Sequence, residues 1–197
     1  VCGRDVTTRM PRRGVSAKVI YNPIDDARFG PVAPEERAAQ RARLNLWNDA
    51  DFVFIFVGVL SDRKQPLVSL EAFLRFQESR PKSAMIVLGD GPLSEACRQL
   101  AQGRRVHFAG NVPDTRPYLA ASDAYIATSK AEGMPVSVIE ALALRLPVVL
   151  SDINPHREIL AINDGAGFLA RTGSVEDTLG AMRKLADGDM SAMGGHA

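Results

Sequence analysis

Several features that are scarce in this sequence exclude whole classes of protein. Its 197 residues hold two cysteines, Cys2 and Cys97, which lie far apart and match no metal-binding spacing. Such cysteines are typical of free thiols in a reducing compartment, so we expect a cytoplasmic protein. No apolar run approaches the roughly 18 residues that cross a bilayer, and no apolar core follows the N-terminal charges as in a signal peptide. We therefore expect neither a membrane-spanning helix nor a signal peptide in these residues.

An excess of charge of either sign is also missing. The net charge is +1, whereas a protein that binds DNA or RNA usually carries a clear basic excess or stripe. Adjacent basic residues such as Arg12–Arg13, Arg63–Lys64 and Arg104–Arg105 are isolated pairs. We therefore expect no nucleic-acid partner. Apolar residues make up 46% and charged residues 24% of the chain, which is typical of a folded globular protein. A chain of 197 residues is long enough for one domain with a core.

Short apolar runs alternate with longer helical patterns from Asp51 onward. The run Phe52–Val59 is continuous and rich in β-branched and aromatic residues, as in a strand buried on both faces of a parallel sheet. The predicted strands are Phe52–Val59, Ala84–Gly89, Arg105–Gly110, Asp123–Thr128, Pro147–Ser151 and Gly165–Ala170. The helices predicted to follow them are Pro66–Pro81, Leu93–Gly103, Arg116–Ala121, Pro135–Arg145, Pro155–Ile162 and Ser174–Asp187.

Six strand-then-helix repeats predict an α/β fold. We expect a doubly wound, Rossmann-like, mostly parallel six-stranded sheet with helices on both faces, because each crossover must return over a face of the sheet. Ligands of such sheets bind outside the carboxyl ends of the strands. The loops that meet this condition are Gly58–Pro66, Gly89–Leu93, Gly110–Thr115 and Thr128–Pro135.

The two ends of the chain do not follow this pattern. We expect residues 1–18 to be a linker or the remnant of a preceding domain, 19–188 to be one nucleotide-sugar-binding domain, and 189–197 to be a flexible tail. A strand and turn are predicted at Val19–Phe29 and a charged surface helix at Pro34–Trp47. We expect both ends to be cut edges of a larger protein.

The segment from Glu132 to Glu140 carries the strongest chemical signal. Glu132 follows a predicted strand, Gly133 allows a ligand to approach the backbone closely, and Pro135 suits the first turn of a helix. The free N–H groups at such a helix end bind anions. Glu140 lies about 7 Å further along the helix, at roughly 1.5 Å per residue. Taken alone, Glu140 is more often a solvated helix residue and Glu132 a loop charge, but the whole segment at this edge of the sheet predicts a ligand site.

This segment, EGMPVSVIE followed by ALALRLPVVLSD, resembles the glutamate pair of glycosyltransferase family 4, the group 1 glycosyltransferases of the GT-B fold. The resemblance covers nearly the whole chain and corresponds to the C-terminal, donor-binding domain of that fold. Further strings are similar to stations of the family in the same order: VIYNPIDDARF, FVFIFVGVLSDRKQP, VLGDGPL, VHFAGNVPDTRPYLAASDAYIATS and GFLARTGSVEDTL.

The resemblance implies a role for each matching residue. Arg63 and Lys64 fall in the basic loop that holds the donor diphosphate, and with Glu132, which contacts the donor sugar, they form the expected catalytic set. Glu140 is expected to bind the ribose, and the backbone near Asn111 and Val112 to read the base. The full set expected to bind the donor is Glu140, Gly133, Met134, Pro135, Val136, Asn111, Val112 and Gly58.

The sequence also departs from the family pattern. Val59 stands where family members usually have an arginine, and Pro23 replaces a glycine. The string INPHRE, Ile153–Glu158, replaces a usual pair of glycines. These differences concern the geometry of the donor site.

Other candidate sites are weaker. The string GDGP, Gly89–Pro92, lacks the third glycine of a dinucleotide fingerprint and favours a turn. His107 lies within a predicted strand, where packing is the simpler role. His156, with Glu158, could contact a ligand, but a role at the start of a helix is equally consistent. Ser129 and Ser137 have no base at a spacing that supports nucleophilic catalysis.

The expected function is therefore the donor half of a retaining glycosyltransferase of polysaccharide or glycan biosynthesis. The donor is a nucleotide-diphosphate sugar, with UDP favoured and GDP or ADP as alternatives, and no metal or other cofactor is expected. An acceptor glycan or lipid-linked acceptor would bind through a missing N-terminal domain, without which the chain is expected to be inactive; only the full-length protein could meet a membrane. The rival is a non-catalytic nucleotide-binding or interaction module. A dehydrogenase is a more distant alternative, because GVLSDRK stands where its glycine fingerprint would be.

Overall fold

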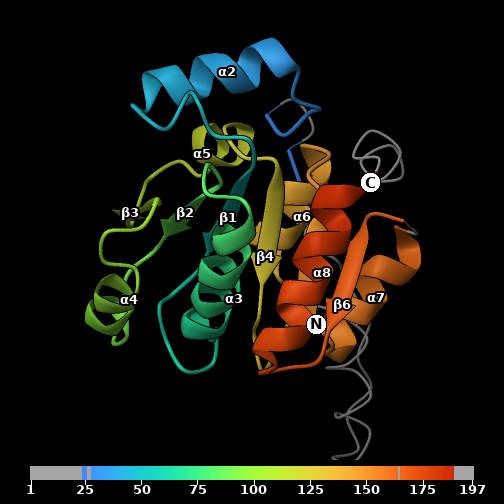
Figure 1. The fold of residues 1–197 in the computed structure, drawn as a ribbon. Helices are drawn as coiled ribbons and strands as arrows, with labels where there is room; N and C mark the ends of the chain where they lie inside the picture. The colour runs from blue at the N-terminus through green and yellow to red at the C-terminus, as the bar shows by residue number, and fades with distance from the viewer. Residues whose placement is uncertain (1–23, 26–27, 164, 189–197) are drawn as a thin grey trace, which may run out of the picture.

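Six parallel strands form one sheet in the order β3-β2-β1-β4-β5-β6, with helices on both faces (Figure 1). The computed structural model describes residues 24–25, 28–163 and 165–188. The strands are β1 Val53–Val57, β2 Ala84–Leu88, β3 Val106–Gly110, β4 Ala124–Ala127, β5 Val148–Ser151 and β6 Gly167–Ala170. The helices are α2 Pro34–Arg43, α3 Pro66–Ser79, α4 Ser94–Leu100, α5 Arg116–Ala120, α6 Val136–Ala143, α7 Asn154–Ile162 and α8 Val175–Asp187. The predicted doubly wound fold is confirmed.

Side chains of β1 alternate between two hydrophobic clusters, one on each face of the sheet. Val53 and Ile55 point to one cluster, and Phe54 and Phe56 point to the other. All four side chains are nearly inaccessible to solvent. This arrangement explains why β1 is a continuous apolar run rather than an alternating one.

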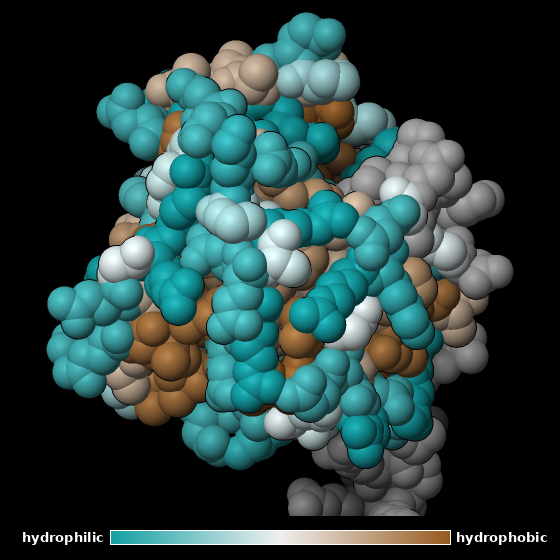
Figure 2. Space-filling view, in the orientation of Figure 1, coloured by the Kyte–Doolittle hydropathy of each residue, from teal (hydrophilic) through white to brown (hydrophobic). Residues whose placement is uncertain are grey.

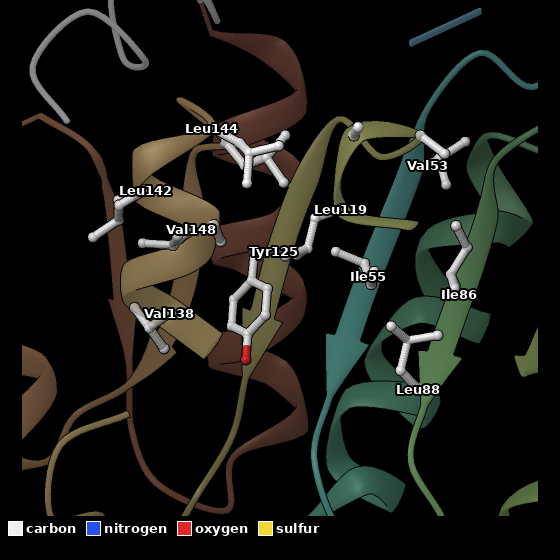
Figure 3. Close-up of a cluster of buried hydrophobic side chains, with 14 of the residues drawn as sticks. Val53, Ile55, Ile86, Leu88, Leu119, Tyr125, Val138, Leu142, Leu144 and Val148 are labelled. Carbon is white, nitrogen blue, oxygen red and sulfur yellow. The ribbon is translucent and has the colours of Figure 1, made fainter. Parts of the chain in front are cut away.

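Each face of the sheet is covered by its own helices. The cluster around Val53 and Ile55 includes Leu119 of α5 and Val138 of α6, and Figure 3 shows these side chains packed together. The cluster around Phe54 and Phe56 takes its side chains from α3, α4 and α8. Figure 2 shows that the outer surface of the face carrying α3 and α8 is mostly hydrophilic, with hydrophobic side chains between the helices.

Helix α2 lies across the end of the sheet where the strands begin (Figure 1). The guanidinium of Arg41 donates to the carboxylate of Asp123 at 2.6 Å and to the carbonyl of Ala121 at 2.8 Å, just before β4. No residue of α2 is buried, as expected for a charged surface helix. The loops at the carboxyl ends of the strands lie at the opposite edge.

The element boundaries lie within three residues of the predictions and several coincide with them, apart from α2, which ends at Arg43 rather than Trp47. The sheet ladder ends where residues lose partners on neighbouring strands, a limit that composition does not mark. Most of the strand predicted at Val19–Phe29, and the linker and tail at 1–18 and 189–197, lie outside the described residues. None of the helices in the described part of the chain is long and apolar enough to cross a membrane.

Candidate ligand site at the carboxyl edge of the sheet

The loops after β1 and β4 meet where the strand order reverses, which is the position where doubly wound sheets bind ligands. The backbone N–H of Lys130 donates to the carbonyl of Arg63 at 2.8 Å. The hydroxyl of Thr128 donates to the carbonyl of Gln65 at 2.8 Å. These bonds join two segments that lie more than sixty residues apart in the chain, and they fix the basic loop against the glutamate segment.

Glu132 forms an ion pair with both basic residues of the first loop. The ammonium of Lys64 lies 2.7 Å from Oε1 of Glu132, and Nη1 of Arg63 lies 3.3 Å from Oε2. Arg63 also donates to the carbonyl of Ala131 at 3.0 Å. The side chains of Glu132 and Lys64 are 7% and 15% exposed, whereas that of Arg63 is 54% exposed. The structure thus brings together the three residues expected to be catalytic.

Two opposing effects set the pKa of Glu132. Burial acts to raise it, but the hydrogen bond with Lys64, the nearby hydroxyl of Ser129 and the positive charges of Lys64 and Arg63 outweigh burial, so the pKa lies below its ordinary value. The carboxylate is therefore ionised at neutral pH, and the two cations that could hold an anion are already partly neutralised.

Glycine residues make room for this arrangement. A Cβ atom on Gly58 would lie 3.3 Å from Cε of Lys64, so the glycine lets the lysine stem cross the end of β1. A Cβ atom on Gly89 would lie 2.1 Å from the carbonyl oxygen of Gly58, which no side chain could tolerate. The GDGP string is therefore a turn packed against the first loop, as the missing third glycine suggested.

Helix α6 begins at Val136, one residue later than predicted, and Pro135 is its cap residue rather than part of the first turn. Proline still suits this place, because the N–H that it lacks would precede the helix. The hydroxyl of Ser137 lies 2.8 Å from the hydroxyl of Tyr125, a wholly buried residue of β4. In Figure 3 the Tyr125 oxygen points along the sheet in the direction of the β1 arrow, toward its carboxyl edge. Tyr125 therefore ties the start of α6 to the sheet.

Glu140 lies in the second turn of α6 and is half-buried, so it is not the freely solvated helix residue of the simpler interpretation. The hydroxyl of Thr115, in the loop after β3, donates to its Oε2 at 3.1 Å. Burial raises the pKa of Glu140, and the hydrogen bond from Thr115 and the charge of Arg28 only partly offset it. The carboxylate is therefore poised as an acceptor that is incompletely satisfied.

The other predicted donor-binding residues are spread along the same edge. Asn111 is exposed directly after β3, and Val112 is half-buried against the core. Gly133 is exposed with open space where a Cβ atom would stand, and Val136 is 45% exposed at the start of α6. Met134 between them is half-buried.

Thr115 and Tyr125 escaped sequence reasoning because nothing local marks them. Each acts through a partner that only the folded chain brings near. His107, for which packing was the simpler role, stacks on Tyr118 with ring centroids 6.4 Å apart. Within the described residues, no three His, Cys, Asp or Glu side chains gather closely enough to hold a metal ion.

Comparison with known proteins identifies relatives of the whole sheet. Residues 51–188, more than half of the chain, match the family model described as "Glycosyl transferases group 1". The chain is 30% identical over 176 residues to a UDP-Gal:alpha-D-GlcNAc-diphosphoundecaprenol alpha-1,3-galactosyltransferase of Escherichia coli, covering 86% of this chain and 45% of that protein. It is also 30% identical over 155 residues to the putative glycosyltransferase EpsD of Bacillus subtilis, covering 76% of this chain and 40% of that protein.

Solved structures share the same architecture. The Anabaena protein Alr3699/HepE, solved in complex with UDP and glucose, superposes with a TM-score of 0.81 at 23% identity, over 97% of this chain and 53% of that one. The C-terminal domain of the group 1 family protein LpcC from Francisella tularensis gives a TM-score of 0.75 at 18% identity, over 88% of this chain and 94% of that one. This chain thus spans less than half the length of the curated relatives above and matches nearly all of an isolated C-terminal domain.

Proposed function

This chain belongs to the group 1 glycosyltransferases, as the C-terminal domain of their GT-B fold, and on that premise we propose that it binds the donor, a nucleotide-diphosphate sugar. The observation that carries the proposal is the Lys64–Arg63–Glu132 ion pair at the mouth of α6. Two cations and the N–H groups of a helix end face the same edge of the sheet, which is a ready site for a diphosphate.

The ligand-free ion pair indicates how the donor enters. A diphosphate carries more negative charge than one carboxylate, so Lys64 and Arg63 turn from Glu132 toward it. The carboxylate of Glu132 is then released to accept hydrogen bonds from hydroxyls of the donor sugar. In this arrangement the cations stabilise the negative charge that develops on the diphosphate as the sugar departs. Retention of configuration is proposed from the family resemblance alone.

The remaining predicted residues take up the nucleoside. Glu140, held by Thr115, accepts hydrogen bonds from the ribose hydroxyls. Backbone groups near Asn111 and Val112 contact the edge of the base. UDP is the favoured nucleotide of the donor, because the HepE structures were solved with UDP or UDP-glucose and the E. coli relative is named for UDP-galactose. The acceptor, a glycan or lipid-linked sugar, belongs to the proposal for the whole protein.

A melting experiment tests this function. We expect UDP to stabilise the chain in the presence of EDTA, because side chains and the helix end neutralise the diphosphate. At 100 times its dissociation constant a ligand adds about 2.7 kcal/mol to the free energy of unfolding. GDP and ADP are measured alongside, and Lys64→Met is the control that should lose the shift. If none of the three diphosphates raised the melting temperature at millimolar concentration, donor binding would be ruled out.

A second candidate is a nucleotide-binding module that does not catalyse transfer. Val59 favours it, because this side chain is apolar and 53% exposed where relatives usually place an arginine. The two candidates differ in a measurement on Val59→Arg. If the site is catalytic and Arg63 alone replaces the missing cation, this substitution tightens UDP binding and speeds donor hydrolysis. In a non-catalytic module the substitution tightens UDP binding but does not speed hydrolysis.

A further inference from the structure

His156 is a buried histidine that the proposed donor site leaves unused. It lies in the first turn of α7, directly beyond β5, and its side chain is 0% exposed. Its Nδ1 lies 2.9 Å from the carbonyl oxygen of Ser151. A carbonyl can only accept, so Nδ1 carries the proton and Nε2 of the neutral ring presents a lone pair. None of the described residues forms a hydrogen bond with that Nε2.

Ser151 links the ring to the segment that carries Glu132. The hydroxyl of Ser151 donates to the carbonyl of Ser129 at 2.6 Å and lies 3.2 Å from Nδ1 of His156, which joins α7 to the residues just before Glu132. The charges of Glu132 and Lys64 both reach the imidazole, acting on its pKa in opposite directions. Burial is the larger effect and lowers the pKa, so the ring is neutral at pH 7.

A second buried polar atom in this cluster lacks a partner. The hydroxyl of Ser129 is close enough to Glu132 to lower the pKa of that carboxyl, yet it meets no atom of the described chain in hydrogen-bonding geometry. Leaving a buried polar group unpaired destabilises the folded protein. Two such atoms on one cluster, beside the proposed sugar-binding carboxylate, indicate partners that are not part of the protein.

We propose that His156 contacts the transferred sugar: with the donor bound, its Nε2 accepts a hydrogen bond from one of the sugar's hydroxyls, beside the carboxylate of Glu132. This inference rests on the proposed donor-binding function. The side chain of His156 is 0% exposed, so in this proposal the contact forms only after the diphosphate has drawn Lys64 away from Glu132. His156 then favours sugars that present a hydroxyl at that position.

Two substitutions separate the nitrogens of the ring. In His156→Asn the amide nitrogen can take the place of Nδ1 and donate to Ser151, while nothing replaces Nε2. In His156→Gln the amide reaches toward the place of Nε2. We expect His156→Asn to bind UDP as the wild type does and to lose about three- to tenfold in affinity for a UDP-sugar, the range of one hydrogen bond. His156→Gln should recover part of that loss.

The measurement is isothermal titration with UDP, UDP-glucose, UDP-galactose and UDP-N-acetylglucosamine. His107→Asn, which removes the histidine stacked on Tyr118 outside the site, is the matched control and should change neither affinity. If His156→Asn weakened UDP and the UDP-sugar equally, or changed neither, a buried water or mere packing would explain Nε2, and the inference would be overturned. A wild type that bound none of these ligands would overturn the proposed donor function as well.

Ring nitrogen shifts test the contact without substitution. In wild-type protein labelled with ¹⁵N-histidine, the Nε2 resonance of His156 should move when a UDP-sugar is added to the UDP-saturated chain. The resonance of His107 should stay. An unmoved Nε2 resonance at saturation with the best-bound UDP-sugar would overturn the inference even if both His156 variants failed to fold.

Discussion

Glu132 partly neutralises the two cations that the donor needs, so its removal should favour binding of the nucleotide over binding of the nucleotide sugar. In Glu132→Gln, Lys64 and Arg63 are released from the carboxylate. We expect UDP to bind more tightly, by about tenfold or more, because a charge-assisted hydrogen bond worth roughly 1.5–3 kcal/mol no longer competes for Lys64. A UDP-sugar should gain less or lose affinity, because its hydroxyls lose their acceptor. Calorimetric titration of both ligands checks this, and a uniform loss for both would show that the carboxylate plays another role.

Glu140 should act on the nucleoside and not on the sugar. Its carboxylate is half-buried and accepts a hydrogen bond from Thr115. We expect Glu140→Gln to weaken UDP and UDP-sugars by the same factor, about tenfold or more, since a hydrogen bond to a charged acceptor contributes roughly 1.5–3 kcal/mol. Thr115→Val should weaken both ligands by a smaller common factor, because it removes only the hydrogen bond that orients the carboxylate of Glu140. A ratio of the two affinities that shifts in Glu140→Gln would contradict the assignment to ribose.

The secondary-structure elements were largely readable from the sequence, because their signals are local. Continuous apolar runs such as Phe52–Val59 predicted buried parallel strands, and six repeats predicted the doubly wound sheet. The edge that carries the site followed from the same rule, so Glu132 and Lys64 were expected near one another. Their ion pair could not be predicted, because it depends on how the pairing of β1 with β4 places the two loops relative to one another.

Contacts between elements were beyond the reach of sequence reasoning. Tyr125 belongs to an apolar run and gave no sign of a polar task, yet its hydroxyl reaches the start of α6. Thr115 and Glu140 lie on different crossovers, so no spacing links them. The same holds for Ser151 and His156, whose hydrogen bonds depend on the turn from β5 into α7.

Tyr125 allows a test of how far α6 depends on the sheet. We expect Tyr125→Phe to lower the free energy of unfolding by about 1–2 kcal/mol, because it removes a hydroxyl that hydrogen-bonds both to Ser137 and to the carbonyl of Val57. UDP affinity should fall as well, because the helix end is held less firmly. Chemical denaturation and titration measure the two effects. The comparison is Ser69→Ala, which removes a buried hydroxyl that hydrogen-bonds to the hydroxyl of Thr128. Equal effects of both variants on UDP affinity would argue against a specific role for α6.

The whole molecule presents one functional edge. The loops after β1, β3 and β4 all emerge where the strands end, and α2 closes the opposite end. Reversal of the strand order between β1 and β4 opens the space in which the basic loop and the glutamate segment meet. Every residue proposed for the donor lies on this edge, and the described residues supply no second sheet to face it.

A single wall of this kind should bind a donor without transferring its sugar efficiently. Transfer between two substrates gains up to about 7–11 kcal/mol from holding both in reactive geometry, and a donor domain alone supplies only one of the two. Incubated with its best-bound UDP-sugar and a panel of acceptors, including GlcNAc-diphosphoundecaprenol, the chain should release sugar slowly to water and form little acceptor product. The E. coli galactosyltransferase, which is more than twice as long as the stretch that this chain covers, is the positive control at equal concentration. Acceptor product formed by the 197-residue chain at a rate comparable with that enzyme would show that the described edge, unaided, binds both substrates.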